Sequence, residues 1–525
     1  MILARPETPA APLAPAGGVI PWQYSARGIA VRLFLTCWLI YALHAATNIV
    51  REIYPAVSLG DHFSLRVDEY AGLHPDLFEK PGFGWHINSN PGASLVGAVP
   101  YALLRPLADR IVAQVNRQRA SSPAAAPVYN SPWPMAREFY QKAWERGVDV
   151  KLGLAALIMQ TLAMAPVSAA GVLAMFFLLR RLLGSDRKAV WFALLYAFGT
   201  PIFFRTGYLN QNLLLAHCLL SGLLALWNPG NAARWPGSAR HFAAGAAGGL
   251  GVLMDYTGVV PLAALSAYAV FANWQHGSFR RVLRLGGWFV TGALGPLALL
   301  WFAQWRSFGH PFYPAQHWMA PVEWVEVGYR GFGWPQWDML AANLFDYRYG
   351  LFVSCPLLLL AFLSLWPQGG FRRVLPAREL VFLFGTAGLL WLFCASVSYS
   401  RLQFNTGVRY MISAVPLLFL PLAVVLDRLP KRVVCFAAVL AVAQAWPMAM
   451  YRDVERGLGV LDPVLHVFLG GFQLPVLSTL SRIGGAYGGY AANGVSPLPL
   501  FVLVAFILYS IWSKRLSTPE SEVRK

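Results

Sequence analysis

The chain has 525 residues, of which 57% are hydrophobic and only 13% charged, and its formal net charge is +18. Soluble domains carry about 25% charged residues, so this composition excludes an ordinary soluble enzyme. The Lys and Arg residues lie in short clusters between apolar stretches. That pattern is typical of the cytoplasmic loops of a membrane protein and argues against nucleic acid as a partner.

Hydropathy predicts an all-α polytopic membrane protein with about 12 transmembrane helices, because only helices satisfy their own backbone within lipid. The first segment, 1–28, is rich in Ala and Pro and is expected to be a disordered cytoplasmic N-terminus. The first span is expected to be an uncleaved anchor, since a signal peptide is shorter. The predicted spans are 29–47, 151–179, 189–204, 209–227, 241–254, 259–274, 285–305, 351–366, 380–397, 408–426, 433–450 and 498–512.

Three long polar segments interrupt these spans, and the charge pattern places them on the outer, periplasmic side of the cytoplasmic (inner) membrane. The boundaries are a membrane domain at 29–512, outer loops at 48–150, 306–349 and 451–496, and a cytoplasmic tail at 513–525. Of the 24 Asp and Glu residues, ten lie from Glu52 to Asp149 in the first outer loop. This concentration of acids beside a bilayer predicts a site at the outer membrane surface, with amphipathic helices in the first loop.

Five segments carry a resemblance to a known superfamily: FSLRVDEY (63–70), GWHINSNPGASLVGAVPYAL (84–103), SFGHPFYPAQ (307–316), YRYGLFVSCPLLLLA (347–361) and FNTGVRYMISAVPLL (404–418). In this order and topology they resemble the GT-C glycosyltransferases, polytopic enzymes that use polyprenyl-phosphate-linked sugars. The nearest branches are the dolichyl-phosphate-mannose-protein mannosyltransferases (glycosyltransferase family 39), the Rgt-type transferases and the aminoarabinose transferase of lipid A. The resemblance implies a GT-C-like helical bundle with a large first outer loop.

One motif departs from the family pattern. Many of these enzymes have a lysine before a double proline, whereas this chain has Asn90 and the single Pro91 in NSNPGAS. The nearest lysine is Lys80 in FEKPG, and the aminoarabinose branch carries a similar EKP. The departure leaves open which cation contacts the donor phosphate.

The chemistry of sugar transfer requires a carboxylate to accept the proton of the acceptor hydroxyl and cations to stabilise the departing phosphate. By analogy with the family, Asp68 is the expected base with Glu69 supporting it, and Asp61 is a third candidate. Direct attack at the anomeric carbon inverts its configuration. The expected substrate-binding residues are Arg66, Lys80, His86, Asn88, Asn90, Arg409 and Tyr410.

The implied partners are a polyprenyl-phosphate-linked sugar, a lipid, glycan or protein acceptor, and membrane lipids. The sequence indicates no cofactor and leaves a divalent metal ion open. We expect the first outer loop to converge in space with the second outer loop and with Arg409.

Structural explanations compete with these roles. Asp68 and Glu69 are also suited to capping a helix, and Arg409 to reaching the lipid headgroups from a helix end. Asp255 falls in a predicted outer turn. The segment GAAGGLGV (245–252) lacks a preceding strand and a lysine, so it predicts close helix packing rather than a phosphate loop.

Other functions remain open. A transporter or flippase of a lipid-linked solute would place ionisable groups within its spans and show related halves, and neither feature is evident. A membrane scaffold would leave the acids and cations of the loop unexplained. Polysaccharide polymerases and ligases share the topology but lack the early acidic motif.

Overall fold

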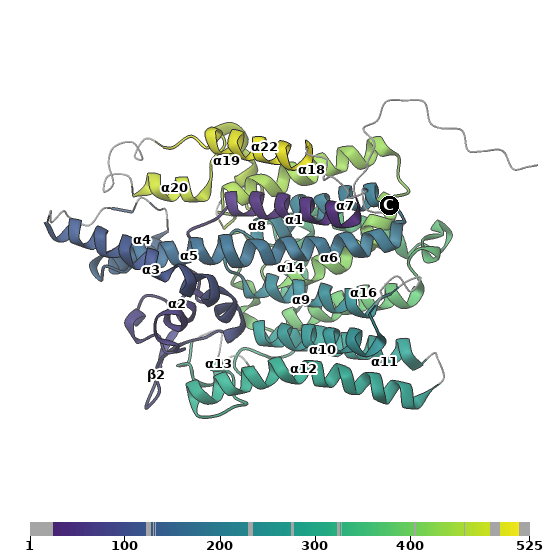
Figure 1. Ribbon diagram of the computed structural model, residues 1–525, viewed down its shortest axis with the longest axis horizontal. Coiled ribbons are helices and arrows are strands. Elements are labelled where there is room, and N and C mark those ends of the chain that lie inside the picture. Colours follow the sequence, from purple (N-terminus) through teal and green to yellow (C-terminus); the bar gives the residue numbers. More distant parts are fainter. Residues whose placement is uncertain are drawn as a thin grey trace, which may run out of the picture.

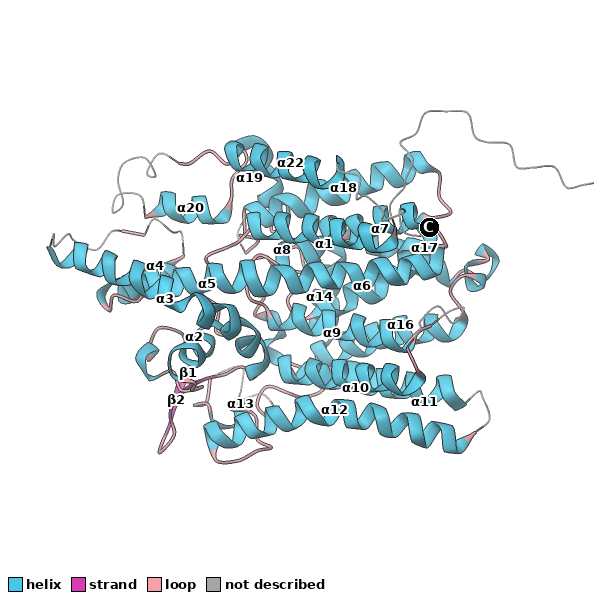
Figure 2. Cartoon of the chain, in the orientation of Figure 1, coloured by secondary structure: helices cyan, strands magenta, loops and turns pink. Residues whose placement is uncertain are grey.

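The computed structural model describes residues 25–121, 128–129, 131, 133–228, 235–274, 278–322, 326, 328–403, 406–455, 457–483 and 494–513. This part of the chain is predominantly helical, which confirms the all-α class (Figure 2). The expected N-terminal segment lies largely outside the described residues, as does the tail from 514 onward.

The first half of the chain contains the anchor, the first outer loop and the central helices. Its elements are α1 (Ala26–Leu43), α2 (Ile53–His62), η1 (Asp68–Tyr70), β1 (Leu77–Lys80), β2 (Gly84–Ile87), α3 (Pro91–Ser121), α4 (Pro134–Glu145), α5 (Asp149–Met159), η2 (Gln160–Met164), α6 (Ala165–Leu183), α7 (Asp186–Phe198), α8 (Pro201–Arg205), α9 (Gln211–Leu226), α10 (Gly237–Met254), η4 (Tyr256–Gly258) and α11 (Val259–Trp274).

The second half begins with a long helix and continues through the second and third outer loops. Its elements are α12 (Phe279–Phe308), α13 (Ala315–Trp318), α14 (Trp337–Phe345), α15 (Leu351–Ser354), η5 (Pro356–Leu365), η6 (Pro367–Gly369), η7 (Phe371–Arg373), α16 (Ala377–Ala395), η8 (Ser398–Arg401), η9 (Met411–Ser413), α17 (Ala414–Leu426), α18 (Lys431–Met450), α19 (Leu461–Gly470), α20 (Pro475–Arg482) and α22 (Leu498–Ser513).

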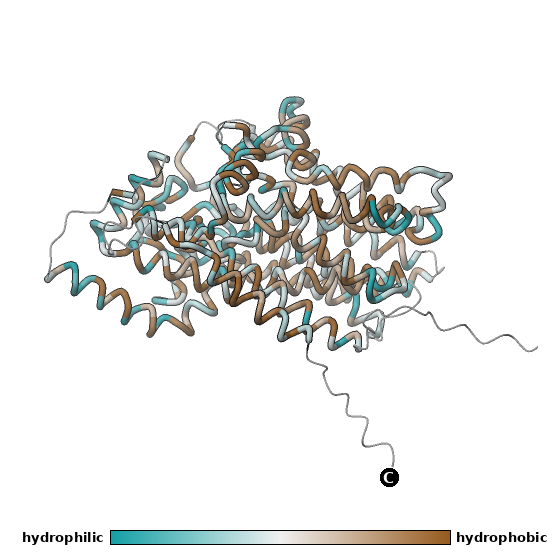
Figure 3. Tube along the Cα trace, turned by 90° about the horizontal axis from the view of Figure 1, so that it is seen from above, coloured by the Kyte–Doolittle hydropathy of each residue, from teal (hydrophilic) through white to brown (hydrophobic). Residues whose placement is uncertain are grey.

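Six helical segments of the described chain are long and apolar enough to cross a membrane, and a seventh arises if the bent pair α19–α20 is one span. Four shorter apolar helical segments accompany them, namely 211–226, 356–365, 411–426 and 498–513. The chain is therefore a multi-pass membrane protein, while the count of about 12 spans stays a prediction. Hydrophobic residues run along the long helices and hydrophilic ones gather towards the two ends of the bundle (Figure 3).

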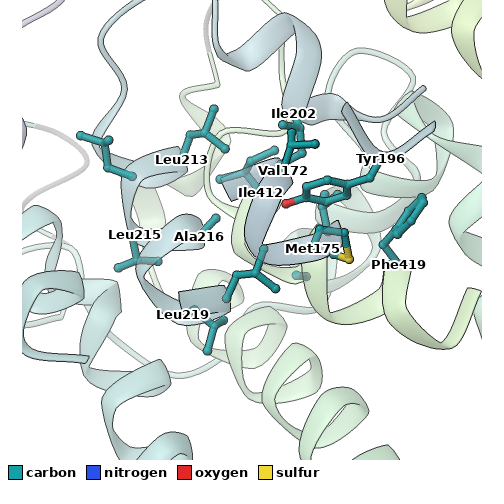
Figure 4. Close-up of a cluster of buried hydrophobic side chains, with 14 of the residues drawn as sticks. Val172, Met175, Tyr196, Ile202, Leu213, Leu215, Ala216, Leu219, Ile412 and Phe419 are labelled. Atoms are coloured by element: carbon teal, nitrogen blue, oxygen red, sulfur yellow. The ribbon is translucent and has the colours of Figure 1, made fainter. Parts of the chain in front are cut away.

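The core lies where α6, α7, α9 and α17 meet. Figure 4 shows Val172 and Met175 of α6, Tyr196 of α7 and Phe419 of α17 among the buried side chains of this cluster. On the outside of the bundle, apolar side chains are exposed instead of buried. Helix α22 has no buried residue although its sequence is almost wholly apolar. Such an apolar exterior is unsuited to water and fits the hydrocarbon of a bilayer.

The small residues of α10 allow close contact with α12, as the GAAGGLGV segment predicts. A methyl group added at Gly249 would lie 2.6 Å from the carbonyl oxygen of Ala293, and one at Gly245 would collide with the carbonyl of Phe289. The prediction of helix packing at this segment is confirmed.

The first outer loop contains a β-hairpin in addition to its helices. Strands β1 and β2 are antiparallel, with Leu77 opposite Ile87 and Lys80 opposite Gly84. The turn contains Pro81 and Gly82, and Gly82 has a φ of 80°. Proline followed by a glycine at positive φ favours a tight reversal. This hairpin was not part of the expected loop of amphipathic helices.

Candidate functional site at the outer end of the bundle

The segments expected on the outer side gather at one end of the molecule. Figure 1 shows α2, β2, α4 and α20 at the same end of the long axis. At the opposite end, Lys188 at the start of α7 forms an ion pair of 2.6 Å with Asp427 after α17. Acidic loops and basic turns therefore occupy different ends, as the charge pattern predicts. Which end faces the periplasm stays a prediction.

The expected base, Asp68, lies at the surface in the short helix η1. Its side chain is 45% exposed and pairs with Arg66 at 2.9 Å. The backbone N–H of Trp85 also donates to its Oδ1 at 2.8 Å, which joins η1 to the hairpin. The neighbouring Glu69 is exposed and contacts His62 at 3.0 Å. Asp68 is thus oriented by two donors while remaining open to a partner from solution.

Asp61 has a different environment at the end of α2. Its side chain is only 3% exposed and forms ion pairs with Arg105 of α3 at 3.2 Å and with Lys151 of α5 at 2.6 Å. The hydroxyl of Tyr101 also donates to it at 3.2 Å. This carboxylate joins α2 and α3 of the first outer loop to α5, and its catalytic role stays a prediction.

Lys80 connects the first outer loop to the second. Its ammonium lies 3.2 Å from the ring centroid of Trp318 and donates to the carbonyl of Phe308. Partial desolvation lowers the pKa of Lys80 below its ordinary value. The expected convergence of these two loops is confirmed.

A narrow cleft lies between the β2–α3 segment and the C-terminal half of α12. His86 and Asn90 line it together with Gln304 and Ser307 of α12. His86 is 3% exposed, and burial lowers its pKa to about 4, although the nearby Phe83 carbonyl opposes that shift. The imidazole is consequently neutral at pH 7.

Asn88 and Asn90 hold the segment that leads into α3. The side-chain amide of Asn90 donates to the carbonyl of Val252 at 2.8 Å, which fixes the start of α3 against the end of α10. The amide of Asn88 points to the sulfur of Met319 at 3.5 Å, and its backbone N–H donates to the carbonyl of Asp76 at 3.1 Å.

Arg51 forms a hub that sequence inspection did not single out. It lies in the segment between the anchor helix α1 and α2, and pairs with Glu52 at 3.2 Å and with Asp76 at 3.3 Å. Burial opposes its charge, but Glu52 and Asp76 raise the pKa of Arg51 above its usual range, with smaller contributions from Tyr410 and Asp255. The available signal was its position, since a charged pair directly after a first span stands at the membrane surface.

The second half of the chain adds to this hub. Arg409, Arg51 and Asp255 all lie within electrostatic range of the buried Tyr410. The backbone N–H of Arg409 donates to Gln403 at 2.7 Å, and its guanidinium lies 5.0 Å from the ring of Tyr410. The expected convergence of the first loop with Arg409 is confirmed by this shared environment.

Asp255 connects the hub to the cleft. One of its carboxylate oxygens accepts from the side chains of Gln211 and Asn212, and the other accepts from the backbone of Thr257. The next residue, Tyr256, lines the cleft. Asp255 therefore lies within electrostatic range of Arg51 and next to a residue that lines the cleft.

This region contains the groups that sugar transfer to a hydroxyl would need. Glu52 is a buried carboxylate, Asp76 and Asp255 are partly buried ones, and Asp68 is the most accessible, while Arg51 and Arg409 supply cations. Within the described residues, no group of three or more His, Cys, Asp or Glu side chains is arranged to hold a metal ion.

No protein-family model matches this chain, and no curated protein matches its sequence. Among solved structures, it is similar to the crystal structure of ArnT from Cupriavidus metallidurans bound to undecaprenyl phosphate. The two chains are 14% identical, with 93% of this chain and 75% of that chain covered and a TM-score of 0.47. ArnT is a GT-C glycosyltransferase.

Proposed function

We propose that this protein is a membrane glycosyltransferase that moves a sugar from a polyprenyl-phosphate donor to a lipid, glycan or protein acceptor. The transfer takes place on the outer face of the cytoplasmic membrane. The observation that carries the proposal is the polar hub around Arg51 at one end of an otherwise apolar bundle. Its members come from the first outer loop, from the turn at Asp255 and from the segment containing Arg409.

The segments that resemble GT-C enzymes support the same interpretation. The 63–70 segment carries Asp68, the 84–103 segment carries His86 and Asn90, and the 404–418 segment carries Arg409. Leu65 of the first segment and His86 and Asn90 of the second line the cleft, and Arg409 of the third lies within electrostatic range of Tyr410, as does Arg51. A chance resemblance in sequence would not require these distant segments to share one region.

The proposed reaction is a direct displacement. The acceptor hydroxyl oxygen attacks the anomeric carbon, the bond from that carbon to the phosphate oxygen breaks, and a carboxylate takes the hydroxyl proton. The configuration at the anomeric carbon inverts. The departing polyprenyl phosphate keeps the electron pair, and arginine or lysine side chains stabilise its charge. The apolar outside of the helices would hold the polyprenyl tail.

Two sets of carboxylates are candidates for the base. Asp68 is the residue favoured by the sequence resemblance, and its exposure gives an acceptor direct access. Glu52 and Asp255 are more enclosed, and both lie beside the cations that would meet a phosphate. We keep Asp68 as the proposed base and treat Glu52 and Asp255 as its rivals.

The test uses the purified protein in lipid with a panel of polyprenyl-phosphate sugars. Release of free polyprenyl phosphate is followed for the wild type and for Asp68→Asn, Glu52→Gln and Asp255→Asn. Loss of a proton acceptor should slow turnover by about 100-fold or more. Asp109→Asn serves as the matched control, because it removes an exposed carboxylate of the same loop that pairs only with Arg105 among the described residues.

The outcomes separate the assignments. Turnover that is lost in Asp68→Asn alone supports the proposed base, and loss in one rival alone moves the base to that residue. The absence of turnover with every donor, together with movement of a lipid-linked solute between leaflets, would support a transporter or flippase instead. Equal loss in the Asp109→Asn control would indicate general damage to the loop.

A further inference from the structure

Two arginines, the buried Arg205 and the partly buried Arg452, lie close to the hub but belong to neither the proposed base nor the cleft. Arg205 ends α8 and Arg452 follows α18, and both guanidinium groups lie against the ring of Tyr208. Their central carbons are 5.1 Å and 4.8 Å from its ring centroid. The pair therefore gathers two positive charges beside one aromatic ring.

The described residues satisfy these arginines only in part. Arg205 is 1% exposed and donates from Nη1 to the carbonyl of Gly407 at 3.3 Å. Arg452 donates from Nη1 to the carbonyl of Phe204 at 2.7 Å. Within the described part of the chain, Nε of both residues and Nη2 of Arg452 are buried without a hydrogen-bond acceptor. Three strong donors are thus left over in one small region.

The charges are not compensated either. No described carboxylate forms an ion pair with Arg205 or Arg452. The acid that acts on Arg205 is Glu52, which is already paired with Arg51. Burial lowers the pKa of Arg452 to about 10, and the charge of Arg205 adds to this fall while Tyr208 opposes it. Burying an unpaired charge costs several kcal/mol, so a persistent pair of this kind indicates a bound anion.

The chemistry of the pair selects the kind of anion. Guanidinium groups present several donors in a planar fork that matches the oxygens of a phosphate, and they are more weakly hydrated than an ammonium group. An anion with a single acceptor would leave several of these donors unused. The ring of Tyr208 lies about 5 Å from both guanidinium groups and adds an aromatic face to the same region.

We propose that Arg205 and Arg452, assisted by Tyr208, form a binding site for a phosphate ester. The phosphate group is carried by a lipid or is free in solution, and it reaches the outer ends of α8 and α18. Gly407, which accepts from Arg205, is two residues before Arg409, so the site lies next to the hub. The choice of polyprenyl phosphate among the possible ligands rests on the proposed function, whereas the recognition of phosphate does not.

The experiment measures binding to the purified full chain in maltoside detergent and phosphate-free buffer. Inorganic phosphate, phosphatidylglycerol, undecaprenyl phosphate and undecaprenol without phosphate are titrated separately. The thermal midpoint, followed by tryptophan fluorescence, reports binding. The variants are Arg205→Met, Arg452→Met and Arg452→Lys. The matched control is Arg146→Gln, an outer-loop arginine that donates to the carbonyl of Ala71.

A phosphate-bearing ligand should raise the midpoint of the wild type and of Arg146→Gln in a saturable manner. Loss of one charged donor group should weaken that binding by about 10-fold or more in the two Met variants. The Lys variant keeps the charge, so it should lose less and should fold where the Met variant does not. Response to inorganic phosphate identifies a free-phosphate site, and response to a phospholipid or to undecaprenyl phosphate alone identifies the lipid source.

The inference would be overturned if no phosphate compound shifted the wild type, if undecaprenol acted as well as its phosphate, or if all three arginine variants bound like the wild type. Its failure is separable from that of the proposed function. Phosphate binding that depends on Arg452, without turnover of any sugar donor, would retain the phosphate site and reject the transferase. If the protein turned over a sugar donor and the arginine variants bound phosphate normally, the transferase would be retained and the phosphate site rejected.

Discussion

Nη1 of Arg51 lies 3.3 Å from Oδ2 of Asp76, although the two residues are 25 positions apart in the chain. Arg51 lies between the anchor helix and α2, and Asp76 stands just before the hairpin. Their contact draws the first outer loop back onto the end of the first span. The same guanidinium also pairs with Glu52. One cation thereby holds two carboxylates at the membrane surface.

Replacing Arg51 with Met should destabilise the protein more than a typical surface change. It leaves the carboxylates of Glu52 and Asp76 beside each other without their shared cation, at a cost of about 2 to 4 kcal/mol. The free energy of unfolding, measured in a denaturing detergent mixture, would report this loss, with Arg146→Gln as the control variant. Equal stability of the two variants would show that the hub is not an organising contact.

The substitutions Asp61→Asn and Asp68→Asn should affect different properties, namely stability for the first and turnover for the second. Asp61 pairs with Arg105 and Lys151, so its neutralisation leaves the largely buried Lys151 without its carboxylate, while Arg105 keeps Asp109, and should cost about 2 to 4 kcal/mol. Asp68 is half-exposed, so Asp68→Asn should change stability by less than about 1 kcal/mol and act mainly on turnover. Thermal midpoints and donor turnover, measured on the same preparations, check both. A stable but inactive Asp61→Asn would instead support its catalytic role.

Lys80→Met should loosen the contact between the first and second outer loops. The substitution removes the hydrogen bond to the Phe308 carbonyl and the cation–π contact with Trp318, worth about 1 to 3 kcal/mol together. Amide hydrogen exchange in 315–319 should accelerate accordingly, while Lys80→Arg should retain most of the protection. If Lys80 also contacts the donor phosphate, the KM for the donor should rise in the Met variant. Unchanged exchange would contradict the proposed link.

His86 should make the hairpin sensitive to acid. Its pKa in the folded protein is about 4, below the ordinary 6.5, so the unfolded or opened loop binds the proton more readily. The stability that the neutral imidazole of His86 contributes is fully present above pH 6.5. It is lost as the pH falls towards 4, by up to about 3 kcal/mol.

Hydrogen exchange of 77–87 between pH 7 and pH 4, corrected for the intrinsic rates, would measure this loss. His86→Gln is the reference, because it keeps the other titrating groups of the loop. If the two proteins showed the same pH dependence, His86 would not be the responsible group.

Much of the outer region could be expected from sequence. The acids of the first loop and the basic turns are local features, so their separation to two ends follows from the order of the spans. The close packing at 245–252 follows from side-chain size alone. The hairpin was missed because each of its strands has four residues, which is too short for a pattern to distinguish it from an irregular loop.

The sequence by itself determined that the chain is helical, multi-pass and acidic at one end, because hydrophobicity and charge act residue by residue. Only the tertiary structure decided which charged groups meet. It enclosed Asp61 among cations, left Asp68 open, and brought Arg51 to Asp76 and Asp255. It also placed Arg205 and Arg452 against one ring. Electrostatic energy depends on distance and burial, and neither quantity is contained in the order of residues along the chain.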